Sequence, residues 1–290
     1  MKREHGGVLI RLLLGLIVFA LLASAGIVWR DFSRFSNAAL AVPADGTSVV
    51  VKRGASFRQI MHGLREHKLS AAPRLYWRAL AWRMDVTDAL HAGEYAITPG
   101  TTPRQLLGEM AAGQVLQHRF TIVEGWRFEE ALAALRADKR LRHPSKGLSD
   151  AEVMQRLGAA GVNPEGRFLP ETYAFVRGDS DLDILKRAHL AMGNLLESAW
   201  PKRDPDLPLD SPYQALILAS IVEKETAQAS ERKRIAGVFE RRLKIGMLLQ
   251  TDPTVIYGMG DKYHGNIRRK DLTTDTPYNT YTRAGLPPTP

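Results

Sequence analysis

Two glutamates stand two residues apart in the segment LASIVEKETA, residues Leu218–Ala227. The apolar residues of this segment recur at the spacing of one helical face, and Glu225 occupies the next position of that face. Glu223 projects about 200° away around the helix axis, so the two carboxyl groups diverge. The spacing therefore predicts two separate carboxyl groups rather than a paired dyad.

A carboxyl group held against apolar neighbours has its charged form disfavoured, so its pKa rises. A protonated carboxyl near neutral pH is the general acid that cleavage of a glycosidic bond requires. Burial on this face would make Glu225 a candidate for such an acid. The alternative is that Glu225 simply ends its helix and pairs with a nearby arginine or lysine.

Two helices are expected to position this residue. The first spans Pro212–Thr226, with Ser211 as its N-cap and the proline at the first helical position. The second spans Ser230–Met247, with Ser230 as a plausible N-cap and Gly246 at its end.

The stretch after these helices is rich in polar and aromatic residues. Asp252 and Pro253 mark a turn or a helix start, and residues Thr276–Pro290 form a loop whose tyrosine, asparagine and threonine side chains suit sugar recognition. An ordinary surface loop has the same composition, and Asp252 is also a candidate helix cap. The candidates to position a glycan strand are Glu223, Gln250, Asp252, Thr254, Tyr257, Tyr278, Asn279 and Tyr281; a purely structural role suits each equally well.

Composition narrows the function classes. The 290 residues contain no cysteine, which excludes disulfides, thiol nucleophiles and cysteine-ligated zinc. A net charge of +9 suits an acidic polymer, anionic lipid headgroups or nucleic acid. The positive residues are scattered and no nucleic-acid-binding motif is present, so we expect no nucleic-acid partner. We also expect no metal and no organic cofactor.

The N-terminus predicts a membrane anchor. Residues Leu12–Trp29 contain no charge, which is about one bilayer crossing. Lys2, Arg3 and Arg11 precede this run and favour a cytoplasmic N-terminus. A cleaved signal peptide is the alternative, because Ala23–Ala25 matches a small-x-small cleavage site. Both interpretations export the chain from about residue 31 onward.

Three stretches share a strand, a glycine turn and the start of an amphipathic helix: Ser48–Leu64, Glu94–Met110 and Phe120–Leu135. The first two contain capping boxes, Ser56 with Gln59 and Thr102 with Gln105. These stretches are either ordinary strand–helix connections or a small LysM-like glycan-binding module. The aromatic residues of Arg74–Leu90 are expected in a helix core rather than stacked on sugars.

These elements predict an α+β protein. A transmembrane anchor occupies residues 1–30, a small LysM-like α/β subdomain residues 40–140, and a mixed α+β catalytic domain residues 150–290. The domain boundary is expected between Leu135 and Pro164.

Three segments carry a resemblance to a known family. Ala219–Arg232, Val238–Gly260 and Tyr278–Pro288 closely resemble the endolytic murein transglycosylases, the MltG or YceG-like family. The N-terminal anchor and the segments Ala92–Gly100, Val123–Glu130 and Leu169–Tyr173 also match. Arg241 departs from the family, which often has asparagine there.

The resemblance implies an enzyme anchored in the inner membrane by one helix, with its catalytic domain in the periplasm. Such an enzyme cuts peptidoglycan glycan strands internally and leaves 1,6-anhydro ends, with Glu225 as acid and then base. Cell-wall synthases are among the partners it implies. Family members continue beyond the GLPP motif, so the resemblance implies a chain truncated at Pro290. A muramidase-type hydrolase with Asp252 as second carboxylate and a non-catalytic glycan-binding scaffold are the alternatives.

Overall fold

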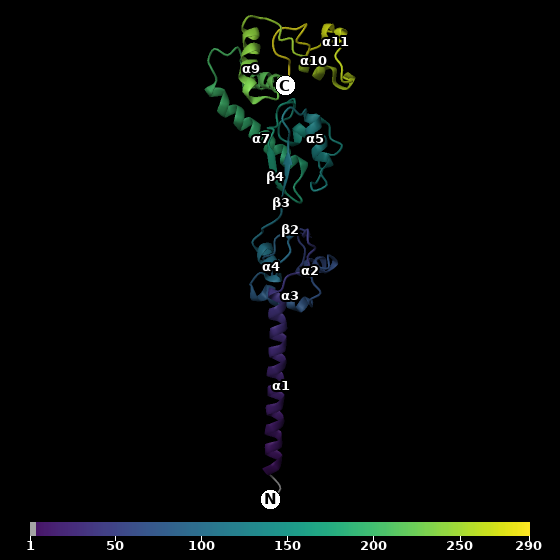
Figure 1. Ribbon diagram of the computed structural model, residues 1–290, viewed down its shortest axis with the longest axis vertical. Helices are drawn as coiled ribbons and strands as arrows, with labels where there is room; N and C mark the ends of the chain where they lie inside the picture. The colour runs from purple at the N-terminus through teal and green to yellow at the C-terminus, as the bar shows by residue number, and fades with distance from the viewer. Residues whose placement is uncertain (1–3) are drawn as a thin grey trace. The chain divides into compact units, whose positions relative to one another are not determined.

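The computed structural model describes residues 4–290, and the side chains from Arg11 onward (Figure 1). The chain forms two compact units, which divide between Gln117 and His118. This division precedes the interval in which the sequence places a domain boundary. Lys2 and Arg3, on which the expected orientation partly rests, lie outside the described residues.

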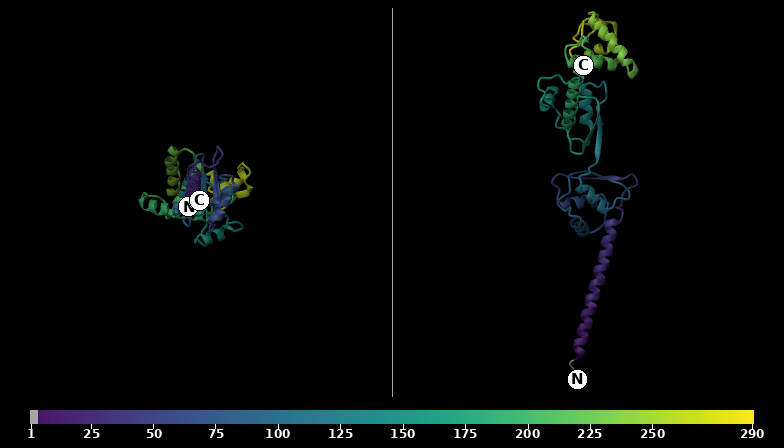
Figure 2. Two further views of the ribbon diagram at one scale, coloured as in Figure 1. Left: turned by 90° about the horizontal axis from the view of Figure 1, so that it is seen from below. Right: turned by 90° about the vertical axis from the view of Figure 1, so that its left-hand side faces the viewer.

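Helix α1, Glu4–Asn37, opens the first unit and continues unbroken into its globular part (Figures 1 and 2). Its segment Arg11–Asn37 has a mean hydropathy of 2.5 over its most apolar window, none of which is buried, and it is long enough to cross a bilayer. The last turns differ, because Phe32 and Ser36 are buried in the core of the unit. The helix is therefore both a candidate anchor and a structural part of the first unit.

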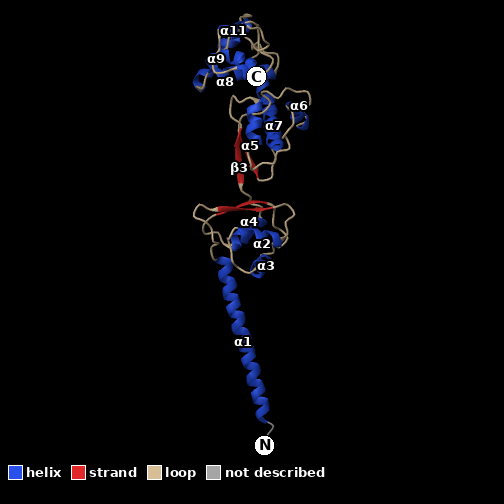
Figure 3. Ribbon diagram, turned by 90° about the vertical axis from the view of Figure 1, so that its right-hand side faces the viewer, coloured by secondary structure: helices blue, strands red, loops and turns tan. Residues whose placement is uncertain are grey.

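The globular part of the first unit contains β1 Thr47–Val51, α2 Phe57–Glu66, α3 Arg74–Arg83, β2 Gly93–Ile97 and α4 Pro103–Ala111. The two strands pair antiparallel, with Thr47 opposite Ile97 and Val51 opposite Gly93. The helices lie between this sheet and α1 (Figure 3). Side chains from all of these elements form one core, which includes Ile60, Leu64, Trp77, Leu80, Tyr95, Ile97, Leu106, Leu107 and Met110.

Both predicted capping boxes are confirmed. The Ser56 hydroxyl accepts the N–H of Gln59, whose side chain accepts the N–H of Ser56, and Thr102 with Gln105 repeats this arrangement. Pro103 occupies the first turn of α4 as expected. Local sequence thus fixes where α2 and α4 begin.

Aromatic packing joins α1 to α3. The rings of Phe35 and Trp77 lie 5.2 Å apart, and those of Phe32 and Tyr76 5.8 Å apart in an edge-to-face arrangement. The Tyr76 hydroxyl also donates a 2.9 Å hydrogen bond to Asp31. These contacts give α1 a defined direction relative to the rest of its unit.

The second unit begins with a lobe of β3 Gln117–Thr121, α5 Phe128–Ala137, α6 Asp150–Arg156, β4 Thr172–Val176 and α7 Asp181–Ala199. Strand β3 pairs with β4. The third predicted strand–turn–helix stretch is therefore present as β3 and α5, but its strand does not pair with β1 or β2. The lobe's core includes Phe128, Leu132, Leu135, Met154, Phe175, Ile184 and Leu185.

A second, mainly helical lobe completes this unit. It contains η1 Trp200–Lys202, α8 Pro212–Glu225, α9 Ala229–Lys244, α10 Asp252–Met259, η2 Gly260–Lys262 and α11 Arg269–Thr273. Its core forms where α8 packs on α9 and the segment before α10, and it includes Leu218, Ile221, Val222, Phe239 and Leu249.

The sequence predicts N-caps for two helices of this lobe, α8 and α9. Ser211 caps α8, as expected, by accepting the N–H of Gln214. Ser230 was expected to cap the next helix, and this is wrong, because α9 begins at Ala229 and Gln228 holds the N-cap position. The Thr226 hydroxyl accepts the N–H of Gln228 instead, so the turn between the helices is tighter than the sequence indicates.

The aromatic packing of α1 generates a prediction about stability. Phe32→Ala removes a ring that is 9% exposed and should lower the free energy of unfolding by about 3–5 kcal/mol. Leu75→Ala, on the outer face of α3 where Leu75 is 71% exposed, should change it by no more than about 0.5 kcal/mol. Denaturant unfolding of the full chain in detergent micelles measures both. Equal effects would show that α1 does not pack as described.

Candidate active site

A large cleft lies between the two lobes of the second unit. Its volume is about 1080 Å³, and residues of α5, α7, α8 and α10 line it together with the loops at Ile122–Arg127 and Pro164–Pro170. Trp126, Tyr257, Tyr263 and Tyr278 contribute aromatic surface. A space of this size with several exposed rings suits a saccharide better than a small ion.

Four of the sequence-predicted residues line this cleft: Glu223, Thr254, Tyr257 and Tyr278. The rings of Tyr257 and Tyr278 lie 4.8 Å apart, and Gly258 permits this approach because a Cβ there would lie 2.9 Å from the Tyr278 Cβ. The Tyr278 hydroxyl also lies 3.0 Å from that of Thr289. The cleft wall here consists of Tyr257 on α10 and Tyr278 on the loop after α11, with their rings tilted against each other.

Glu225 does not have the buried position predicted for it. It is the last residue of α8 and its side chain is exposed, and it is not among the residues that line the cleft. The apolar stripe ends one turn earlier at Val222, because the core shared with α9 and Leu249 extends no further along α8. The helical face was assigned correctly, but the burial was not.

The Glu225 carboxylate nevertheless has specific neighbours. The hydroxyl of the buried Thr251 donates a 3.2 Å hydrogen bond to it. The Tyr281 hydroxyl donates a 2.6 Å hydrogen bond to Asp252. Burial of Tyr281, its hydrogen bond to Asp252 and the nearby Glu225 charge raise the pKa of Tyr281 to about 12, so it remains a donor at neutral pH. We call Glu225, Gln250, Thr251, Asp252 and Tyr281 the acidic cluster.

Two details of the acidic cluster differ from the sequence-based alternatives. Asp252 is not a helix cap, because Thr251 holds the N-cap position of α10 and Asp252 is the first helical residue. Gln250 adopts a φ of 52°, a conformation that costs a non-glycine residue on the order of 1–3 kcal/mol. Its N–H donates a 3.0 Å hydrogen bond to the Thr280 carbonyl, which holds the strained residue in place.

An ion pair with a nearby arginine or lysine was the alternative role for Glu225, but it is Glu223 that forms such a pair. Its carboxylate lies 2.9 Å from the Arg232 guanidinium, and its side chain is 29% exposed. The two glutamates therefore differ in environment: Glu223 is paired and faces the cleft, whereas Glu225 is held by a neutral hydroxyl beside Asp252.

Asn279 and Thr254 hold the framework around these residues. Asn279 is 1% exposed, and its amide nitrogen lies 2.7–3.2 Å from the carbonyls of Asp271, Leu272 and Thr274. Thr254 is buried and donates to the Thr251 carbonyl. These bonds fix the loop that carries Tyr278 and Tyr281.

Glu165 is a cleft residue that the sequence reasoning missed. It lies in the loop between α6 and β4, and its carboxylate accepts a 3.1 Å hydrogen bond from the N–H of Phe128 at the start of α5. Burial raises the pKa of Glu165, although the hydrogen bonds from Phe128 and Tyr257 act in the opposite direction. The only signal in the sequence is an acid inside the turn-forming run Asn163–Gly166, which does not by itself indicate burial.

Among residues 4–290, no three His, Cys, Asp or Glu side chains come together in a group that could hold a metal ion.

Glu165 generates a pH prediction. With its pKa raised in the folded state, the folded chain retains a proton that the unfolded chain loses, so stability falls as the pH rises above about 4.5. Glu165→Gln keeps an oxygen for the Phe128 N–H but does not titrate. The stability of this variant relative to the parent should increase from pH 4.5 toward neutrality, by about 1.4 kcal/mol per unit of pKa increase. Unfolding in detergent across this range measures the difference. A difference as flat as that of the exposed Glu171→Gln control would contradict it.

Asn279 generates a stability prediction. Asn279→Ala leaves three part-buried carbonyl groups without their donor and should cost about 1–3 kcal/mol. Arg283→Ala in the same loop removes an exposed salt bridge to Asp275 and should cost no more than about 1 kcal/mol. Denaturant midpoints of the two variants decide the matter; a smaller loss for Asn279→Ala would mean that its hydrogen bonds do not hold the loop.

Sequence comparisons with known proteins indicate one family. Residues 49–290 match the sequence model of the YceG-like family. The endolytic murein transglycosylase of Bacillus subtilis (strain 168) is 39% identical over 126 residues, which is 43% of this chain and 34% of that protein. The protein of the same name from Streptococcus pneumoniae serotype 2 (strain D39) is 32% identical over 131 residues, which is 43% of this chain and 23% of that protein.

The chain thus matches about a third or less of the length of these two relatives. A crystal structure of a YceG-like protein from Listeria monocytogenes aligns over 86% of each chain, at 25% identity and a TM-score of 0.45.

Proposed function

Because the chain belongs to the YceG-like family, we propose that it is an endolytic lytic transglycosylase that cleaves peptidoglycan glycan strands. The names of the similar Bacillus and Streptococcus proteins support the general activity. The observation that carries the site assignment is the acidic cluster, in which Thr251 orients Glu225 at the C-terminal end of α8 and Tyr281 binds Asp252 at the start of α10. Ser220, Glu223 and Lys224 line the cleft, and Glu225 follows directly on the same helix.

In this proposal Glu225 serves twice. It protonates the oxygen of the glycosidic bond between the muramic acid and the next sugar, so that this oxygen leaves as a hydroxyl. It then takes the proton from the C6 hydroxyl of the muramic acid, whose oxygen closes onto C1 and gives a 1,6-anhydro end. The substrate's own N-acetyl group is suited to stabilise the intermediate, as in substrate-assisted glycosidases. No water attacks, so one carboxyl group is sufficient.

Because Glu225 is exposed in the free chain, the proposal requires the bound substrate to desolvate it. A saccharide that extends from the cleft across the last turn of α8 would exclude water from the carboxyl group and so favour its protonated form. The Thr251 hydroxyl orients the carboxylate through its 3.2 Å hydrogen bond. Tyr257 and Tyr278 in the cleft wall offer flat surfaces for sugar rings. Gln250, Asp252 and Tyr281 are proposed to contact the strand near the bond that breaks.

A muramidase-type hydrolase is the second candidate function, and Asp252 is the observation that favours it. Its carboxylate lies in the acidic cluster with Glu225 and accepts a hydrogen bond from Tyr281. A second carboxylate of this kind could activate a water molecule. A non-catalytic scaffold that binds glycan strands is the third candidate, and it requires only the cleft.

The location of the enzyme belongs to the same proposal. We place α1 across the inner membrane, with its N-terminus in the cytoplasm and the second unit in the periplasm. The pairing of β1 with β2 beside α2 and α4 supports a LysM-like glycan-binding role for the first unit. Cell-wall synthases that produce nascent strands are the proposed protein partners.

Product analysis of peptidoglycan digested by the full chain tests this function. Mass spectrometry should detect 1,6-anhydro ends from the parent protein, and Glu225→Gln should reduce their formation by at least about 100-fold, the usual contribution of a general acid. Binding of glycan strands should be unchanged, because the amide keeps the shape of the side chain.

Two control variants separate the carboxyl groups. Glu223→Gln removes the ion pair with Arg232, and Glu165→Gln replaces the half-buried carboxyl of the cleft; both should retain most of the cleavage activity. Reducing ends in place of anhydro ends would favour the hydrolase and make Asp252→Asn the decisive variant. Full activity in Glu225→Gln would remove Glu225 from the mechanism.

A further inference from the structure

Helix α3 exposes apolar side chains on the face opposite its core. Trp77 and Leu80 are 3% and 0% exposed and belong to the core of the first unit. Leu75 and Trp82 are 71% and 79% exposed. Large apolar side chains this open to solvent, in a helix that already has a core face, indicate a surface with a partner.

The spacing places these exposed residues together. At 100° per residue, Leu75 and Trp82 point within about 20° of each other, and Trp77 points about 200° away from Leu75. Arg78 is exposed beside them, and the helix RLYWRALAWR contains three arginines and no acidic residue. Tryptophan and leucine flanked by arginine are typical of helices that lie at a membrane surface.

Contacts between α3 and α1 show which part of α1 lies beside α3. Tyr76, near the start of α3, donates to Asp31, and the guanidinium of Arg83, its last residue, lies 4.8 Å from the centre of the Trp29 ring. The rings of Tyr76 and Trp77 also contact Phe35, so α3 crosses α1 obliquely over about two turns, of which the turn Trp29–Asp31 is the first. This turn is where the uncharged run of Leu12–Trp29 ends.

The direction of the exposed face follows from the core face. Trp77 packs against Phe35, which lies one turn beyond Asp31 toward the C-terminal end of α1. The opposite face of α3, with Leu75 and Trp82, therefore looks back along α1 toward its apolar run. Eighteen residues of helix span about 27 Å, close to the thickness of a hydrocarbon core, so this face reaches the level of the lipid headgroups.

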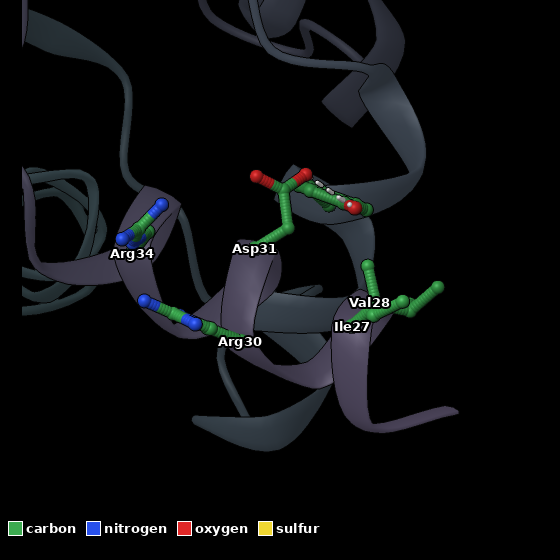
Figure 4. Close-up of a pocket in the computed structure, with 6 residues that line it drawn as sticks. Ile27, Val28, Arg30, Asp31 and Arg34 are labelled. Atoms are coloured by element: carbon green, nitrogen blue, oxygen red, sulfur yellow. Dashed lines mark hydrogen bonds between the residues drawn. The ribbon is translucent and has the colours of Figure 1, made fainter. Parts of the chain in front are cut away.

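A cavity at the same level adds groups that suit a phosphate. Its volume is about 410 Å³, and Ile27, Val28, Arg30 and Arg34 line it with Asp31 and Tyr76 (Figure 4). Arg30 and Arg34 stand one helical turn apart and extend to the same side of α1 (Figure 4). Asp31 is engaged by Tyr76. The two guanidinium groups suit a phosphate, and Ile27 and Val28 in the same lining offer apolar surface to the start of an acyl chain.

We propose that the outer face of α3 and the Arg30–Arg34 cavity form one surface that seats in the headgroup layer of a bilayer containing anionic phospholipid. The inference rests on the proposed role of α1 as a membrane anchor. It goes further, because it places the globular part of the first unit against the membrane surface. An anchor alone would leave that part free to move away from the membrane. The arginines contact the phosphates, and Leu75 and Trp82 enter the boundary of the acyl chains.

The absence of cysteine from the sequence permits a clean test. Single cysteines introduced by Trp82→Cys, Val50→Cys and Val18→Cys are labelled with an environment-sensitive fluorophore. The full chain is then placed in nanodiscs of phosphatidylcholine with phosphatidylglycerol. Val50 is exposed on β1, in the sheet that the helices separate from α1, and serves as the control within the same unit (Figure 3). Val18 lies in the apolar run and reports insertion of the anchor.

Spin-labelled lipids distinguish the outcomes. The probe at position 82 should be quenched by shallow spin labels, the probe at position 18 by deep ones, and the probe at position 50 by neither. Quenching at position 18 with no quenching at position 82 would overturn the inference and leave the anchor intact. No quenching at either position would overturn both. Protection of position 82 in detergent without lipid would assign the face to a second copy of the chain and also overturn the inference.

The arginines are tested separately. In Arg30→Gln/Arg34→Gln, the blue shift of the probe at position 82 should lose its dependence on phosphatidylglycerol relative to nanodiscs of phosphatidylcholine alone. Lys52→Gln/Arg53→Gln removes the same charge at the end of β1 and should retain that dependence. Equal behaviour of the two pairs would show that general positive charge, rather than the Arg30–Arg34 cavity, attracts the lipid.

Discussion

The hydrogen bond from Thr251 to Glu225 joins the C-terminal end of α8 to the N-terminal end of α10, and the acidic cluster depends on it. Thr251 is buried, and its N–H donates a hydrogen bond to the hydroxyl of Thr280, which belongs to a third segment of the chain. The strained Gln250 donates to the carbonyl of the same Thr280. Three segments far apart in the sequence therefore meet at one point, and Glu225 is oriented although it is exposed.

Sequence reasoning predicted the local features of this arrangement because they depend on neighbouring residues. Ser211 and Pro212 start α8, and the capping boxes start α2 and α4, through bonds that span three residues. The same reasoning failed for Ser230, because the N-cap of α9 is Gln228, two residues earlier, and the Thr226 hydroxyl accepts the N–H of Gln228. The pattern around Ser230 does not include the turn at Thr226, which ends α8 and precedes α9.

Burial could not be predicted in the same way. The periodicity of α8 identifies the face that carries Glu225, but how far that face is covered depends on where α9 and Leu249 pack against it. Glu165 shows the converse: nothing in its own segment indicates burial, and its environment comes from Phe128 and Tyr257, which are 37 and 92 residues away in the chain. The family resemblance predicts a catalytic role for Glu225 without information about its surroundings, and its exposure is the reason for proposing that the substrate desolvates it.

The aromatic residues of helix α3 lie in two different environments. Its aromatic residues predict a core helix, and Trp77 confirms this, but Trp82 lies on the opposite face and is exposed. A soluble helix has one apolar face, because its other side is solvated. A helix that crosses an anchor at the edge of a bilayer has two apolar environments, the protein above it and the lipid boundary below it. In the proposed membrane seating, the lipid boundary accounts for the second apolar face of α3, and the packing of the buried Phe32 against Tyr76 fixes the direction of α1 relative to the rest of the first unit.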